Sequence, residues 1–349
     1  MEKNQLLDEF RKCREDPEYF ISNYIKVTHP IRGLVPFRLY PFQQRILSEI
    51  EGHRFSILRK FRQAGCTTIA AAYSLWTITF QKHKSVVILS KGDAESTEVL
   101  DRIKLMYDEL PSFLKPGIIE DNKHTLKLKT NSVIKSRPSG KQSGRSLAGS
   151  LLIIDEAAFI ENIDTIWAAV YPIISTGGRA FVLSTVNGIG NWYHDVYQKA
   201  LDGGNSFHPI DIRWKEHPEY NYNPKFEHLY EIMREKGLDI HKWEETTKSN
   251  MSHKKWLQEY ECSFLGTGDT FVNNEILEQI ASDVNENYYI IGRYQAEKWL
   301  SDEVFNIINI IKEYENDNFG KVNTDFSKPE KVVNMYVYII GEYIVNDYI

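Results

Sequence analysis

Residues 59–68 read Arg59-Lys60-Phe61-Arg62-Gln63-Ala64-Gly65-Cys66-Thr67-Thr68, between an apolar run that begins at Phe55 and a helical stretch that reaches about Phe80. A strand, a glycine turn and a helix start direct several backbone N–H groups at one place, with the positive end of the helix dipole behind them. This order predicts a phosphate-binding loop. The alternative is a strand-to-helix turn with incidental basic residues.

The loop departs from the usual Gly-x4-Gly-Lys-Ser/Thr pattern. It lacks the first glycine, and Cys66 stands where the lysine belongs. Thr67 keeps the hydroxyl that would bind Mg2+. A cysteine at a helix N-terminus can have a lowered pKa and be oxidisable, and a buried inert thiol is the alternative.

Apolar runs alternate with helical stretches around this loop. Continuously apolar short strands between helices predict an α/β fold, a P-loop NTPase-like mostly parallel sheet with helices on both faces. Ligands of such sheets bind beyond the carboxyl ends of the strands. Strands are expected at 55–58, 85–90, 151–154 and 180–183, and helices from Pro41, at 67–80 and at 94–110.

The third expected strand ends in two acids, Asp155 and Glu156. This is the Walker B form, in which Asp155 would hold Mg2+ and Glu156 would position and deprotonate the attacking water. The alternative is a strand followed by a helix N-cap, because aspartate is a preferred capping residue. The pairing with a phosphate loop about 90 residues earlier favours the catalytic interpretation.

Two further segments carry weaker signals. Small polar residues, Ser184, Thr185 and Asn187, follow the fourth strand and could sense a γ-phosphate, although Asn-Gly is also a strong turn signal. Gln43, in the helix that begins at Pro41, could read an adenine edge, because its amide both donates and accepts hydrogen bonds. An ordinary surface glutamine is the alternative.

Composition restricts the partners. The chain has 349 residues, a formal net charge of -6 and a pI near 6.0, whereas a stand-alone DNA-binding domain is usually basic. Any DNA contact must therefore use a local basic patch, an oligomer or another domain. Lys135, Arg137, Lys141 and Arg145 lie in a Ser/Gly-rich stretch expected to be a loop. They are candidate contacts, and a mobile solvated loop is the alternative.

The three cysteines are far apart in the sequence, which disfavours a zinc site or a disulfide framework and fits a reducing cytosol. The N-terminus is polar and carries no apolar signal segment. No apolar stretch approaches the length of a membrane span.

Several segments, in this order, resemble the large terminase subunit of tailed bacteriophages, over about residues 15–275. Together they are far more specific than any one of them. The segments are residues 16–21 (DPEYFI), 29–37 (HPIRGLVPF), 39–43 (LYPFQ), 62–68 (RQAGCTT), 154–160 (IDEAAFI), 183–188 (LSTVNG) and 261–271 (ECSFLGTGDTF).

The resemblance implies a role for each matching position. Gln43 resembles the adenine-reading glutamine, and Arg62 resembles a loop arginine that acts in cis on the γ-phosphate, as an arginine finger does. Gln63, Ala64, Gly65, Cys66, Thr67 and Thr68 match the phosphate cradle. Because Cys66 replaces the lysine, we expect Lys60 at the start of the loop to reach the β- and γ-phosphates, as in some members of the family.

The acids and the segment after the fourth strand match as well. Thr67 and Asp155 would hold the metal ion, and Glu156 would be the catalytic acid. Ser184, Thr185 and Asn187 match the coupling motif, which passes hydrolysis on to movement. The implied cofactors are therefore ATP and Mg2+.

The resemblance also implies a domain plan and partners. Residues 1–280 would form the ATPase domain, with a core at about 37–214 and a helical lid subdomain from 1–36 and 215–270. The tail at 281–349 is too short for the family's nuclease domain, so nuclease activity is not expected in this chain. The implied partners are double-stranded DNA, the portal protein, the small terminase subunit and four further copies of the chain in a pentamer. It would act in the host cell cytoplasm, transiently at the procapsid portal, with no membrane.

Two alternatives to an ATP-hydrolysing packaging motor remain. The Cys66 departure and the unusual tail favour a nucleotide-binding but non-hydrolysing interaction protein from a truncated or interrupted terminase gene. A helicase-like DNA-dependent ATPase would usually show a second motor domain, and the sequence offers no such segment.

Overall fold

The structure, a computed structural model, describes residues 3–138, 149–175 and 177–265. By internal contacts the chain divides into a unit of residues 1–265 and a unit of residues 266–349. All described residues belong to the first unit. The expected tail at 281–349, and the proposed DNA contacts Lys141 and Arg145, therefore lie outside the described residues.

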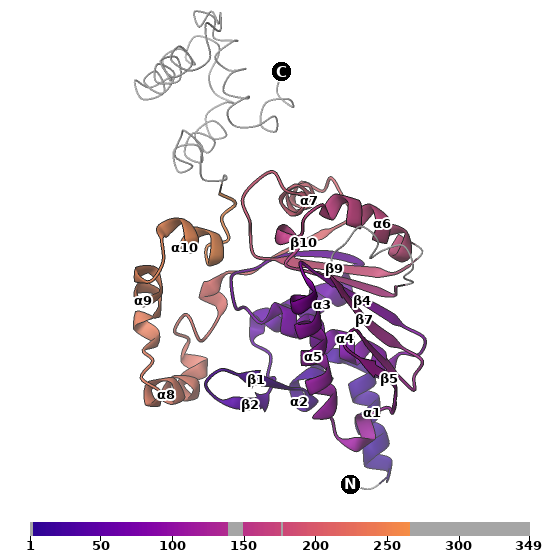
Figure 1. Cartoon of the computed structure of the whole chain (residues 1–349). Coiled ribbons are helices and arrows are strands. Elements are labelled where there is room, and N and C mark those ends of the chain that lie inside the picture. Colours follow the sequence, from indigo (N-terminus) through magenta and orange to yellow (C-terminus); the bar gives the residue numbers. More distant parts are fainter. Residues whose placement is uncertain (1–2, 139–148, 176, 266–349) are drawn as a thin grey trace, which may run out of the picture. The chain divides into compact units, whose positions relative to one another are not determined.

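The first unit is built on an eight-stranded sheet (Figure 1). Its five pairings from β10 to β7 are parallel, and β6 and β5 extend it with antiparallel pairings. The mostly parallel sheet predicted from the sequence is confirmed. In spatial order the strands are β10 (His208–Asp211), β3 (Phe55–Arg59), β9 (Arg179–Ser184), β8 (Leu151–Asp155), β4 (Ser85–Ser90), β7 (Val133–Pro138), β6 (Thr125–Leu128) and β5 (Ile118–Asn122).

Helices cover both faces of the sheet because successive strand residues point to opposite sides and both sides are apolar. In β3, Leu58 belongs to one buried cluster and Ile57 to the other. The first cluster lies under α1 (Lys3–Glu15), α2 (Pro17–Tyr24), α3 (Pro41–Gly52), α4 (Cys66–Phe80) and α5 (Asp93–Asp108). The second lies under α6 (Ile163–Ser175) and α7 (Trp192–Leu201), on the other side of the sheet in Figure 1.

The stretch after α2 and the strands β5, β6, β7 and β10 differ from the sequence-based expectation. The stretch after α2, where no strand was expected, forms a hairpin of β1 (Lys26–His29) and β2 (Gly33–Pro36), and Gly33 in its turn has φ +69°. Strand β5 was not anticipated, because all five of its residues are exposed and give no apolar alternation. An exposed edge strand lacks the alternation of apolar and polar residues from which a half-buried strand is predicted.

The charged stretch after β10 is helical, as expected. It contains α8 (Glu227–Glu235), α9 (Trp243–Ser249) and α10 (His253–Glu259). A small cluster of its own, which includes Leu229 and Met233, supports α8. The hairpin of β1 and β2 joins this region, because His29 and Arg32 each approach the Glu219 carboxylate to 3.2 Å.

Helices α1 and α2 pack within the main buried cluster. The indole of Trp76 in α4 donates to the carbonyl of Cys13 at 2.8 Å, and Phe20 and Ile21 are fully buried. Among the described residues, no helix has the length and apolar character needed to cross a membrane.

Candidate functional site

Three neighbouring strands of the sheet deliver the predicted site residues to one edge. Strand β9 lies between β3 and β8, with Arg59 opposite Ser184 and Asp155 opposite Leu183. The carboxyl ends of the three strands therefore bring together the loop after β3, the acids at the end of β8 and the polar segment after β9. This is the edge at which parallel sheets bind ligands.

The loop after β3 has the backbone of an anion cradle. Gln63 and Gly65 adopt left-handed φ values of +61° and +75°. Gly65 is the N-cap of α4, and among the described residues no side chain caps this helix, so its first-turn N–H groups remain for a ligand. A Cβ at Gly65 would lie 2.8 Å from Nε2 of Gln43, so both the conformation and the close contact favour glycine.

Lys60 lies at the centre of the site. Its Nζ is 2.7 Å from Oε1 of Glu156, and the residue is only 5% exposed. Burial acts to lower the pKa of Lys60, but the carboxylates of Glu156 and Asp155 outweigh it, and the pKa is raised. A protonated amine therefore stands in the site although the usual lysine position holds Cys66.

Asp155 and Thr67 form a pair of oxygen donors. The Thr67 hydroxyl lies 3.1 and 2.9 Å from the two carboxylate oxygens of Asp155. Burial raises the pKa of Asp155 to about 6, even though Lys60 acts to lower it. A buried carboxylate next to a hydroxyl suits Mg2+, which prefers oxygen ligands, so the residues present fit the ion expected from the sequence.

Glu156 has a strained backbone. Its φ is +51° and its ψ is 44°, a left-handed conformation that costs about 1–2 kcal/mol in a residue with a Cβ. Contacts from two sides hold its carboxylate: Lys60 Nζ at Oε1 and the backbone N–H of Thr185 at 3.4 Å from Oε2. The strained residue is thus the one whose carboxylate is held in a fixed direction by contacts from two sides.

The polar segment after β9 is fastened to the turn that follows Glu156. The Ser184 hydroxyl accepts a hydrogen bond from the N–H of Ala158 at 3.1 Å, and the Asn187 amide donates to the carbonyl of Ala158 at 3.0 Å. Thr185 is 4% exposed. Displacement of the Glu156 turn would therefore be passed directly to this segment.

Gln43 and Arg62 are engaged with other residues of the protein. The Gln43 amide donates to the carbonyl of Ala64 at 3.1 Å and accepts from the N–H of Tyr40 at 3.0 Å, so it braces the loop from behind. The Arg62 side chain is 61% exposed, and its Nη1 lies 3.5 Å from Oε1 of Glu259. The backbone N–H of Arg62 also donates to the Glu259 carbonyl at 2.7 Å.

Helix α10 makes two contacts to the site that the sequence did not predict. Nε2 of Gln258 donates to the carbonyl of Val186 at 2.9 Å, and the adjacent Glu259 holds Arg62. This helix therefore touches both the phosphate loop and the polar segment after β9. No motif could have marked these residues, since they lie in an ordinary charged helix.

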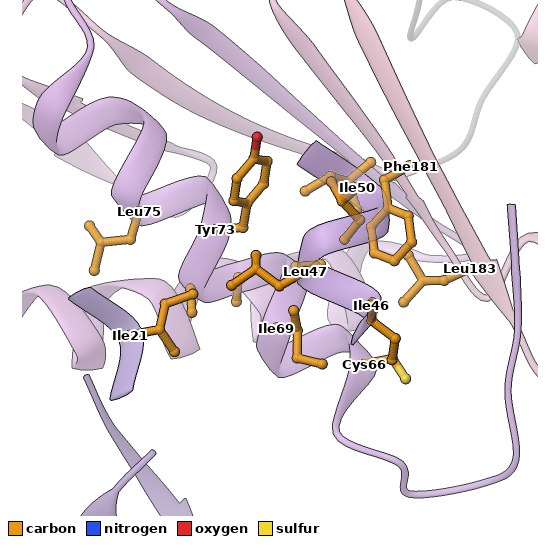
Figure 2. Close-up of a cluster of buried hydrophobic side chains, with 14 of the residues drawn as sticks. Ile21, Ile46, Leu47, Ile50, Cys66, Ile69, Tyr73, Leu75, Phe181 and Leu183 are labelled. Carbon is orange, nitrogen blue, oxygen red and sulfur yellow. The ribbon is translucent and has the colours of Figure 1, made fainter. Parts of the chain in front are cut away.

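Cys66 is an apolar core residue. It is 1% exposed and belongs to the main buried cluster, which Figure 2 draws with Ile46 and Leu183 among its members. Burial raises the pKa of its thiol to about 12. Of the two interpretations left by the sequence, the structure therefore supports the buried, inert thiol.

The expected DNA-contact loop is partly a strand. Lys135 and Arg137 lie on β7, where they alternate with Ile134 and Ser136, which are fully buried. The loop expectation is wrong for these two residues. A two-residue alternation of this kind turns both basic side chains to the less buried face of the strand.

Asp155 should limit the stability of the nucleotide-free protein. Its folded pKa of about 6 lies above the ordinary value of 3.8, so the stability it contributes is present at low pH and is lost as the pH rises through that window. We expect Asp155→Asn to raise the free energy of unfolding by about 1–3 kcal/mol at pH 8 and by less at pH 5. Denaturant titrations at both pH values measure this effect.

The exposed Asp164 supplies the matched control. Asp164→Asn should leave stability nearly unchanged at both pH values. An Asp155→Asn protein less stable than wild type at pH 8 would contradict the argument.

Comparisons with known proteins agree with the geometry. Residues 58–279 match the profile of a family described as "Terminase large subunit, T4likevirus-type, N-terminal". Among solved structures, the ATPase domain of the Thermus phage P74-26 large terminase is 15% identical, with a TM-score of 0.48; the match covers 66% of this chain and 95% of that one.

Two longer proteins are also similar. The HK97 bacteriophage large terminase is 18% identical, with a TM-score of 0.49, and the match covers 78% of this chain and 52% of that one. A large terminase from a thermophilic bacteriophage, solved in complex with ADP, is 11% identical, with a TM-score of 0.48 and coverages of 65% and 53%. This chain thus spans about half the length of these two proteins.

Proposed function

Because the chain belongs to the family of T4-type large terminase subunits, of which it carries the N-terminal part, its function is that of a DNA-packaging ATPase motor, and we propose that it hydrolyses ATP at the edge formed by β3, β9 and β8. The observation that carries this proposal is the meeting of four side chains from the ends of two strands and the first turn of α4: Lys60, Thr67, Asp155 and Glu156. A cation, a hydroxyl and two acids, together with a helix N-terminus that has no side-chain cap, suit a nucleoside triphosphate.

In the proposed reaction the phosphates bind the N–H groups of the loop and the first turn of α4. The Lys60 ammonium, which contacts Glu156 in the structure, would then contact the β- and γ-phosphates. Thr67 and Asp155 would hold Mg2+, which would neutralise charge on the phosphate oxygens. Glu156, freed from the ion pair, orients the attacking water and accepts its proton.

In the structure Arg62 contacts Glu259, whereas the proposed catalysis requires it to contact the γ-phosphate. Its guanidinium is near Glu259, so it must leave that carboxylate to offset charge on the γ-phosphate. Only the Arg62 end of this ion pair is exposed, since the Glu259 side chain is 11% exposed. Lys255 Nζ, 3.7 Å from the same carboxylate oxygen, would still accompany Glu259 after Arg62 leaves. We propose that nucleotide binding moves Arg62 inward and releases α10 from the loop.

Coupling to movement would use the same helix. Loss of the γ-phosphate changes the contacts of Glu156, and the turn at Ala158 carries the change to Ser184 and Asn187. Gln258 then carries it from Val186 to α10. We propose that residues 215–265, the described part of the expected 215–270 segment, act together with the hairpin from the first 36 residues as the lid that converts hydrolysis into movement.

Removal of the Gln258 amide should weaken the stimulation of ATP hydrolysis by DNA without changing hydrolysis in the absence of DNA. In Gln258→Leu the hydrogen bond to Val186 is lost while the site residues stay in place. We expect ATP hydrolysis without DNA to stay near the wild-type rate and the increase caused by double-stranded DNA to fall. Gln198→Leu, the same change on α7, is the control, and an unaltered DNA response in Gln258→Leu would argue against this route.

The partners follow from the family. We propose that the motor moves double-stranded DNA through contacts to phosphates, which are insensitive to sequence, and that Lys135 and Arg137 are candidates for such contacts. We further propose a pentamer on the portal protein, supplied with DNA by the small terminase subunit, in the host cell cytoplasm.

The test is Mg2+-dependent ATP hydrolysis by the purified chain, with and without double-stranded DNA. Hydrolysis that requires Mg2+ and increases with DNA supports the motor. Binding of ATP with no turnover under either condition would favour the non-hydrolysing interaction protein instead. Stimulation by single-stranded DNA alone would favour the helicase-like alternative.

A further inference from the structure

A second cluster of ligand-type side chains lies at the opposite end of the sheet. Glu49 and His53 are four residues apart at the end of α3, and His208 is the first residue of β10. His208 pairs with Ser56 near the amino end of β3, whereas the candidate ATP site follows the carboxyl end of that strand. The two sites are therefore separated by the length of the strand.

One carboxylate oxygen joins the two imidazoles. Oε2 of Glu49 is 3.3 Å from Nδ1 of His53 and 3.0 Å from Nε2 of His208. Ligand atoms that share one tetrahedral zinc at about 2.0–2.1 Å lie roughly 3.3–3.4 Å from each other. The distances from the carboxylate oxygen to the two ring nitrogens are therefore close to the distances between ligand atoms around one metal ion.

The two rings are stacked, with centroids 3.6 Å apart and planes at 3°. The in-plane lone pairs of stacked rings run side by side, so one ring must turn to bring both nitrogens onto a shared ion. His53 is the C-cap of α3 and its side chain is 42% exposed, and a rotation of its ring would give up the 3.1 Å contact between Nδ1 and the Glu49 carbonyl. A candidate ligand atom from each residue lies within 4.8 Å of the others.

Two arginines of this region have backbone carbonyls as hydrogen-bond partners. The guanidinium of Arg54 donates to the carbonyls of Ile174, Ser175 and Gly178, and that of Arg179 donates to the carbonyls at the end of α3. Among the described residues, the cluster is also the one group of three His, Cys, Asp or Glu side chains that could hold a metal.

We propose that Glu49, His53 and His208 bind a transition-metal cation of the zinc class, with water completing the coordination. Two imidazoles and one carboxylate form a donor set typical of Zn2+ rather than of Mg2+. The ion would clip the end of α3 to the edge strand β10. Because α3 also carries Gln43, which braces the phosphate loop, the clip would fix the helix that supports the nucleotide site.

The experiment titrates the full chain, without a histidine tag, with Co2+ as a spectroscopic substitute for Zn2+. Excess Mg2+ is present throughout, so that the oxygen ligands of the ATP site do not take up Co2+. We expect a visible absorption band of four- or five-coordinate Co2+ that Zn2+ abolishes. Zn2+ should also raise the unfolding temperature of the wild type.

Three variants decide the assignment. Glu49→Gln and His208→Asn should each weaken Co2+ binding by roughly tenfold or more, the loss typical even for removing a group that only supports a ligand. His228→Asn, at an exposed position of α8, should bind as the wild type does. Thermal unfolding without metal checks that each variant is folded.

The proposal is overturned if the wild type gives only the weak band of hydrated Co2+, or if Glu49→Gln and His208→Asn bind as tightly as His228→Asn. The readout is metal binding, so it does not depend on whether the chain hydrolyses ATP.

Discussion

Glu156→Gln is expected to bind ATP and to lose its hydrolysis, with kcat falling by about 10²–10⁴-fold, the usual contribution of a general base. The amide keeps the size of the side chain and an oxygen that can still accept from the N–H of Thr185. It cannot take a proton from water. The left-handed backbone of residue 156 is as accessible to glutamine as to glutamate, so the fold should be retained.

The two halves of this prediction are measured separately. Binding of a fluorescent ATP analogue reports the site, and single-turnover hydrolysis reports the chemistry. Glu161→Gln, an exposed glutamate a few residues further along, is the matched control and should hydrolyse ATP as the wild type does. Hydrolysis by Glu156→Gln at the wild-type rate would show that another group activates the water.

The site residues that could be predicted from the sequence were predictable for one shared physical reason. Lys60, Asp155 and Ser184 each follow or end an apolar strand, and the carboxyl ends of parallel strands meet at one edge whatever the rest of the chain does. Knowing that three such strands exist is therefore enough to bring the residues together. The order of the strands, with β9 between β3 and β8, fixes which residues then touch.

The parts that were missed have no local signal. Gln258 and Glu259 reach the site because α10 packs beside it, and helix packing depends on contacts far apart in the sequence. The engagement of Gln43 with Ala64 and Tyr40 is of the same kind. A glutamine near a phosphate loop could be predicted, but its actual hydrogen-bond partners depend on the position of α3 against the loop.

Lys60→Met should have the second large effect, on both stability and hydrolysis. The methionine preserves most of the volume but leaves Asp155 and Glu156 without their cation. The Glu156 side chain is 33% exposed, but Asp155 stays buried without a compensating charge, so we expect a loss of stability of about 1–3 kcal/mol. Hydrolysis should be lost because Arg62, the other cation proposed to act on the phosphates, does not replace the buried ammonium beside Glu156. Exposed Lys236→Met is the control.

The pH dependence identifies the cause of the destabilisation. The Lys60 ammonium acts to lower the pKa of Asp155, so its removal should raise that pKa further above about 6. A carboxyl with a raised folded pKa contributes stability at low pH that is lost as the pH rises through that value. The variant should therefore be closest to wild type near pH 5 and least stable, relative to it, near pH 8. A destabilisation independent of pH would point to packing instead.

A second substitution tests whether the position of the cation matters. Cys66→Lys in the wild-type background introduces a second ammonium into the core next to Lys60, and like charges in a buried site repel, so we expect lower stability and no gain in hydrolysis. In the Lys60→Met background the same change supplies the missing charge from the usual lysine position. Partial recovery of hydrolysis in the double variant would show that the loop needs one buried cation and accepts it from either end. If the wild type is inactive and Cys66→Lys alone restores turnover, Lys60 does not replace the missing lysine and this chain is a disabled motor.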